Sequence, residues 1–236
     1  MAILHFIIIF KRVVYWDYSF FCILVPIKLK ITTMITDKMS DMEIFKEVWS
    51  EREAVHGYME RLIPKYRRPI IKSNKFPMYF TPIEFVSRKN NRYLIFFEAR
   101  NKKDWERGIL YTIICLYEKQ GGTNVMMFST VSKAIHIYSP HFFSRYRSRF
   151  LKDDSMPPLD VIKRFFKINP TATIYLVEDS DEFYGTCNEG AIFGKITADN
   201  VIVLKTFVSF DMLHDSQEHI KTEIYDNLIK YRAEIQ

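Results

Sequence analysis

One short basic segment holds the residues of this sequence that are best suited to chemistry. His141, Arg145 and Arg149 are spaced four residues apart, and Ser139 and Pro140 stand just before them. Serine is a favoured N-cap and proline a favoured first helical residue, so the pattern predicts a helix over residues 140–152. At 3.6 residues per turn, the three side chains would lie along one stripe of that helix.

Such a stripe suits the metal-independent cleavage of RNA by its own 2′-hydroxyl group. Histidine supplies an acid or base that titrates near neutral pH, and arginine can stabilise charge on a pentacovalent phosphate through a bidentate fork. Backbone amides at the start of the helix, beside His141, would add positive potential. The same residues also fit a plain surface helix whose arginines are solvated and whose histidine caps or packs, so the helix alone leaves both interpretations open.

The spacing His141-x3-Arg145-x3-Arg149 after Ser139 resembles the histidine and arginine helix of the barnase/EndoU/colicin/RelE-like superfamily of ribonucleases and toxins. In that superfamily the histidine helix precedes a small antiparallel sheet, whose last strand often brings a threonine or serine to the cleft. The resemblance covers residues 139–209. It implies that His141 is the acid or base, that Arg145 and Arg149 hold the phosphate, and that a hydroxyl of Thr206 or Ser209 binds it. A large β-rich region before residue 139 and a long 151–190 segment depart from the family pattern.

A second basic segment lies between Pro64 and Lys75 and is interrupted by two prolines. We expect it to be irregular and exposed. A charge run of this kind is either a solvated face or a contact to phosphates of a nucleic acid backbone. The candidate nucleic-acid contacts are Lys65, Arg67, Arg68, Lys72 and Lys75, together with Arg147 from the histidine helix.

The total charge gives little support to a nucleic-acid partner. The 236 residues carry a formal net charge of +6. Residues 1–38 contain five lysines and arginines against two aspartates, so half of the excess lies in this short segment. The prediction of RNA as a partner therefore depends on the two basic segments and not on the overall charge.

The other reactive residues of the sequence are weaker candidates for a functional site. Cys22, Cys115 and Cys187 are too scattered for a disulfide framework or a CxxC metal site, which favours a reducing, cytoplasmic location. Cys115 lies in an apolar run and is expected to be a small buried residue. His214 and His219 are five residues apart and would diverge by about 140° on a helix. We therefore predict no metal site and no small-molecule cofactor.

Residues 1–38 differ from the rest and are interpreted as a doubtful leader. Residues 1–25 are apolar but broken by three charges, whereas a spanning helix needs about 20 mainly apolar residues. A signal peptide fits poorly too, because a charged n-region and a small-residue cleavage site are missing. The preferred explanation is a natural start at Met34, Met39 or Met42, and the alternative is a membrane-associating anchor within residues 1–25.

Residues 42–236 are predicted to form a single α+β domain, with one or more antiparallel sheets and flanking helices. Amphipathic helices are expected near both ends of this domain, over 41–63 with its end at Pro64 and over about 210–234. A further helix is expected over 158–168, and 100–108 is expected to be a loop or a single helical turn. The candidate strands are 93–97, 109–117, 125–128, 134–138, 173–177, 191–196 and 201–209.

These features predict a metal-independent ribonuclease-like or RNA-binding protein that is toxin-like or encoded by a mobile element. An alternative from another class is a non-enzymatic domain that binds a protein partner through an aromatic-rich surface or its N-terminal helix. Aromatic residues make up 16% of the chain, which leaves this alternative open. The exposure of His141 is the structural observation that bears most directly on the choice.

Overall fold

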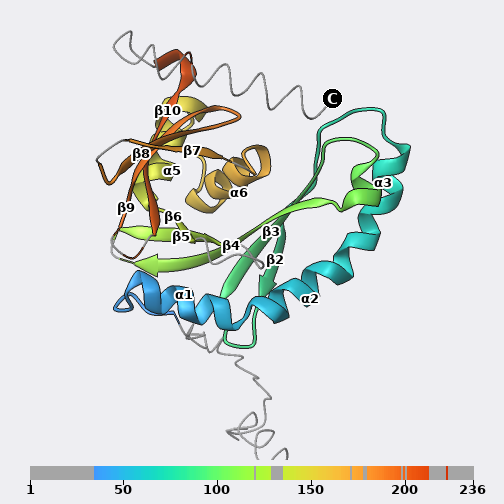
Figure 1. Ribbon diagram of the computed structural model, residues 1–236, viewed down its shortest axis with the longest axis horizontal. Coiled ribbons are helices and arrows are strands. Elements are labelled where there is room, and N and C mark those ends of the chain that lie inside the picture. The colour runs from blue at the N-terminus through green and yellow to red at the C-terminus, as the bar shows by residue number, and fades with distance from the viewer. Residues whose placement is uncertain are drawn as a thin grey trace, which may run out of the picture. The chain divides into compact units, whose positions relative to one another are not determined.

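The computed structural model describes residues 35–119, 121–128, 135–170, 172–177, 180–197, 199, 201–212 and 222. These residues form one mixed ten-stranded sheet flanked by helices (Figure 1), which is the α+β class that the sequence predicts. The helical elements are α1 (Asp41–Ser50), α2 (Arg52–Leu62), η2 (Ile63–Tyr66), α3 (Arg67–Lys72), α4 (Asp104–Arg107), α5 (Pro140–Tyr146), η3 (Arg147–Leu151), α6 (Pro158–Ile168) and η4 (Phe210–Met212). The strands are β1 (Met78–Tyr79), β2 (Ile83–Val86), β3 (Arg92–Ala99), β4 (Leu110–Lys119), β5 (Gly122–Phe128), β6 (Ile135–Tyr138), β7 (Thr173–Leu176), β8 (Glu182–Cys187), β9 (Gly190–Ile196) and β10 (Ile202–Ser209).

The sheet consists of two antiparallel meanders that meet at one parallel pair of strands. The strand order is β1-β3-β4-β5-β6-β10-β9-β8-β7, and β2 also pairs with β3. Strands β6 and β10 run parallel, with Ile202 opposite His136 and Leu204 opposite Tyr138. The prediction of purely antiparallel pairing is therefore wrong at this position. The chain leaves β6 through α5 and α6, begins the second meander at its far edge with β7, and reaches β6 again only with β10.

Side chains from opposite faces of the sheet enter two separate cores. Alternate residues of β3 illustrate the division, because Tyr93, Ile95 and Phe97 belong to the first core, whereas Leu94 and Phe96 belong to the second. The first core is completed by α1, α2 and α3, and the second by α5 and α6. Helices thus cover both faces of the first meander, which explains why β3 and β4 read as nearly continuous apolar runs.

Three details of the first helical region differ from the sequence prediction. The single helix expected over 41–63 is divided into α1 and α2, which meet at Glu51. Pro64 does not end the helical region, because it lies in the first turn of η2, where a missing amide hydrogen breaks no bond. The segment after it is exposed, as expected, but α3 is helical and not irregular.

The local sequence accounts for the start of α1, and α4 forms where a single helical turn was one of the expected outcomes. Ser40 caps α1 and forms a capping box with Glu43, whose pKa is lowered chiefly by hydrogen bonds from Ser40. Residues 104–107 form the single helical turn α4, one of the two expected outcomes for this segment. The expectations for residues 1–34 lie outside the described residues. So does the helix expected over 210–234, apart from η4 and Thr222.

Candidate functional site

Helix α5 begins where the sequence predicts. The Ser139 hydroxyl accepts a hydrogen bond from the Phe142 amide at 3.3 Å, and Pro140 is the first helical residue. Phe142, Phe143 and Tyr146 are buried in the second core. Ring contacts to Tyr138, Phe165, Phe166 and Phe207 hold them there. Pairs of this kind contribute about 0.5–1.5 kcal/mol each beyond their buried area, so the rotation of α5 about its axis is fixed.

This rotation leaves His141 exposed and places Arg145 beside it. Arg145 Nε donates a hydrogen bond to His141 Nε2 across 3.1 Å, one helical turn apart. A guanidinium can only donate, so His141 Nε2 is the acceptor in this hydrogen bond. The pair presents one permanent cation and one titratable imidazole to solvent, which is chemistry that could bind a phosphate and move a proton.

Arg149 and Thr206 do not join this pair in one cleft. Arg149 lies in the π-helical turn η3, and its Nη1 donates to the carbonyl oxygen of Phe207 in β10 at 3.0 Å. Phe207 faces the second core under α5, so its neighbour Thr206 lies on the other face of the sheet. The structure therefore brings His141 and Arg145 together and ties Arg149 to a strand, and it separates Thr206 from all three.

Ser209 lies on the same side of β10 as Phe207, but it is only 2% exposed. Burial keeps the Ser209 hydroxyl away from a ligand that contacts His141 from solvent.

Arg147 also differs in its surroundings from the other candidate contacts for nucleic acid. Its side chain is half-buried between α5 and α6, and Nη1 donates to the Met156 carbonyl oxygen at 3.2 Å. It lines a pocket of about 280 Å³ together with residues of α5, α6 and the β4–β5 turn. Arg147 thus faces a small cavity and not an open basic surface.

The remaining candidate contacts form a continuous exposed surface around α3. Ile70 is fully buried in the first core, and the Tyr66 ring packs against Phe80 and Phe97 at centroid distances of 4.5 and 4.7 Å. The cationic side chains around Ile70 and Tyr66 are exposed. Lys102 approaches from the turn before α4 and donates to Asn74 Oδ1 at 3.0 Å. We call this set the α3 basic surface; its members, all exposed, are Lys65, Arg67, Arg68, Lys72, Lys75, Lys102 and Lys103.

The α3 basic surface and the His141–Arg145 pair belong to opposite sides of the sheet. Helix α3 contributes Ile70 to the first core, whereas α5 contributes Phe142 to the second (Figure 1). The two basic segments that the sequence offers as possible RNA contacts therefore lie on two different surfaces.

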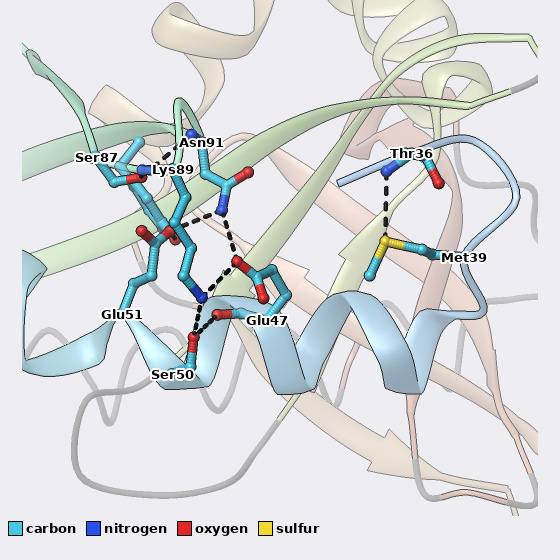
Figure 2. A network of polar contacts seen from close by, with 9 residues as sticks. Thr36, Met39, Glu47, Ser50, Glu51, Ser87, Lys89 and Asn91 are labelled. Carbon is cyan, nitrogen blue, oxygen red and sulfur yellow. Dashed lines mark hydrogen bonds and ion pairs between the residues drawn. The ribbon is translucent and has the colours of Figure 1, made fainter. Parts of the chain in front are cut away.

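Sequence reasoning missed a polar network that joins α1 to the β2–β3 turn (Figure 2). The buried Glu51 carboxylate accepts hydrogen bonds from Asn91 Nδ2 and the Tyr93 hydroxyl, both at 2.7 Å. Glu47 forms an ion pair with Lys89 at 2.9 Å and also accepts a 3.4 Å hydrogen bond from Asn91 Nδ2. Two glutamates four residues apart on one helix were the available signal.

The chemistry of this network is structural. Burial raises the pKa of the Tyr93 hydroxyl and of the nearby Cys115 thiol, because the charged form of each would be desolvated. Cys115 is fully buried, as the sequence predicts, and is held in its unreactive thiol form. The donors around Glu51 satisfy a buried carboxylate, which fixes α1 against β3.

No group of three or more His, Cys, Asp or Glu side chains within the described part of the chain is arranged to hold a metal ion. His214 and His219 lie outside that part. Among the helices that are described, none combines the length and the apolar character needed to cross a membrane. Comparisons of the chain with models of protein families, with curated proteins and with solved structures found no match.

Proposed function

We propose that this chain binds RNA and that the α3 basic surface is its main contact with the phosphates. The observation that supports this proposal is a set of seven exposed cations for which the described residues provide no ion pair. The acidic neighbours along the chain are Asp104 and Glu106 of α4, where Asp104 accepts hydrogen bonds from the backbone amides of Arg100 and Asn101, and Arg107 lies next to Glu106. Phosphates would displace the counterions that these lysines and arginines hold, which is the usual source of affinity for nucleic acids.

The rigidity of the surface favours binding. Ile70 and Tyr66 pack α3 against the sheet, and Lys102 is oriented by its hydrogen bond to Asn74. The cations are therefore already close together before RNA binds. A preformed surface loses less conformational entropy on binding than a flexible basic tail.

Removal of charge from α3 tests the proposal. The variant carries Arg67→Gln, Arg68→Gln, Lys72→Gln and Lys75→Gln, and fluorescence anisotropy measures its affinity for labelled single-stranded RNA. We expect a loss of at least tenfold. A control variant removes the same charge from exposed positions elsewhere, through Lys38→Gln, Lys46→Gln, Arg88→Gln and Lys205→Gln. Equal losses in the two variants would contradict a specific α3 contact.

Metal-independent cleavage of RNA is a second candidate function, and the His141–Arg145 hydrogen bond favours it. His141 Nε2 is held as an acceptor next to a guanidinium, so a phosphate that draws Arg145 away would leave a base beside the bound anion. Single-stranded and transfer RNA incubated with the protein in EDTA should then be cleaved. Cleavage should be lost in His141→Ala, reduced in Arg145→Lys, and unchanged in Thr206→Val, because Thr206 lies on the other face of the sheet.

Absence of cleavage by the unmodified protein would remove this second function and leave the binding proposal intact. A protein-interaction domain is the alternative from another class. RNA affinity that is weak and does not depend on salt would favour a protein partner over RNA.

A further inference from the structure

The pocket between α5, α6 and the β4–β5 turn is lined neither by the α3 basic surface nor by His141 and Arg145. Its volume is about 280 Å³, close to the lower limit of about 300 Å³ for pockets that bind small molecules. Most of its wall is apolar and comes from Pro140, Phe143, Pro158, Val161 and Ile162. The polar lining residues are Glu118, Thr123, Ser144 and Arg147, together with Gly121 and Gly122.

Arg147 is the cationic residue among those that line this pocket. Its Nη1 is bonded to the Met156 carbonyl, but its buried Nε has no hydrogen-bond partner among the described residues. No carboxylate of those residues forms an ion pair with it. Asp153 accepts hydrogen bonds from the backbone amide and the hydroxyl of Ser155, and the charge of Arg147 is the smallest of the causes that lower the pKa of Asp153. The described residues satisfy this half-buried guanidinium only in part, and an anion in the pocket would give it a further acceptor and a counter-charge.

The rim of the pocket limits what that anion can be. Glu118 is exposed there and accepts a 2.6 Å hydrogen bond from Thr123 Oγ1, so its carboxylate is fixed at the entrance. A second negative charge on the ligand would be repelled by this carboxylate. The apolar wall would leave a phosphate or sulfate without partners on most sides.

From this lining we infer that the pocket binds a small monocarboxylic acid, with its carboxylate on Arg147 and its apolar body between Phe143, Val161 and Ile162. Arginine recognises a carboxylate through two parallel hydrogen bonds, and the apolar wall supplies the hydrophobic part of the affinity. This inference goes beyond the proposed RNA binding and does not depend on it.

Isothermal titration calorimetry of the full chain tests the inference with matched probes. Butyrate, hexanoate and phenylacetate are compared with the corresponding amides, which have nearly the same shape without the charge. We expect at least one acid to bind saturably with one site per chain, and its amide to bind at least tenfold more weakly. Arg147→Gln should remove this preference for the acid.

Two tryptophan variants on the same helical segment locate the site. Ser144 is exposed and lines the pocket, so Ser144→Trp should block it, whereas Ser148→Trp is an equally exposed control that does not line the pocket. Loss of binding in Ser144→Trp alone is expected. No saturable binding by any of the acids, equal binding of acid and amide, or undiminished binding in Ser144→Trp would each overturn the inference. None of these results would alter the RNA-binding test.

Discussion

At the scale of single residues, the polar bonds to Glu51 are expected to stabilise the fold measurably. Tyr93→Phe removes one donor from a carboxylate that is 7% exposed. Asn91 still donates to Glu51 in this variant, and we expect the free energy of unfolding to fall by about 1–3 kcal/mol, because a hydrogen bond to a charged group typically contributes about 1.5–3 kcal/mol. Urea denaturation measures the change. Tyr58→Phe is the control, because the Tyr58 ring stacks on Phe85 at 4.6 Å and its loss of a hydroxyl should have little effect.

The burial of His136 leads to a prediction about how the stability of the protein depends on pH. Burial lowers its pKa, because the imidazolium form would be desolvated between β5 and β10. The unfolded chain therefore takes up this proton at a higher pH than the folded protein does. Stability should be lost as the pH falls through about 6.5, the ordinary pKa of histidine. Denaturation midpoints at several pH values should fall less steeply for His136→Gln than for the unmodified protein, and parallel profiles would contradict this reasoning.

Residue-level sequence signals predicted part of the candidate site. The start of α5 at Ser139 and Pro140 and the neighbourhood of His141 and Arg145 follow from local rules of helix geometry. The position of Arg149 does not, because the helix changes to a π-helical turn and the side chain finds a carbonyl on β10. The family resemblance suggested Thr206 as a phosphate contact, but the sequence does not reveal the register shift between Leu204 and Thr206, after which Phe207 faces the second core and Thr206 faces the other way.

At the scale of elements, one network joins α5, α6 and the β8–β9 turn. Glu189 accepts hydrogen bonds from Tyr146, Arg164 and Asn169, and the Arg164–Glu189 ion pair has an N–O distance of 2.5 Å. The Glu189 side chain is 12% exposed, so the pair is well shielded from water. These contacts connect three elements that are distant in the sequence.

Glu189→Ala should lower the free energy of unfolding by about 1–3 kcal/mol, because three donors lose their acceptor at once. A double-mutant cycle with Arg164→Ala should show a favourable coupling between the two residues. The exposed pair of Lys195 and Asp181 is the control, and Lys195→Ala should cost at most about 1 kcal/mol. Equal effects at the two ion pairs would show that the network does not connect the elements in the way described.

The elements that the sequence missed were those with weak local signals. Strand β8 begins at Glu182 and contains Gly185, which weaken the strand pattern of Phe183, Tyr184 and Thr186. Its middle is fixed by close packing, since a side chain at Gly185 would collide with the Thr173 carbonyl of β7. Helix α3 contains Pro69, which favours an irregular segment by local rules, and the burial of Ile70 in the first core overrides them.

At the scale of the whole described domain, the arrangement of the sheet could not be predicted from the sequence. The parallel pairing of β6 with β10 joins residues more than sixty positions apart, such as His136 and Ile202. Local periodicity gives the strands but not their partners. The same arrangement places α3 and α5 on opposite faces, so the two basic segments of the sequence lie on different surfaces.

The salt dependence of RNA affinity is the measurement that tests the central proposal most directly. Each phosphate contact to single-stranded RNA contributes about −0.7 to the slope of log K against log salt concentration. If four to seven cations of the α3 basic surface contact phosphates, the slope should be about −3 to −5. The α3 glutamine variant should reduce the slope by about 3, and the control variant should leave it unchanged. A slope near zero for the unmodified protein, or the same slope for all three proteins, would contradict RNA binding through α3.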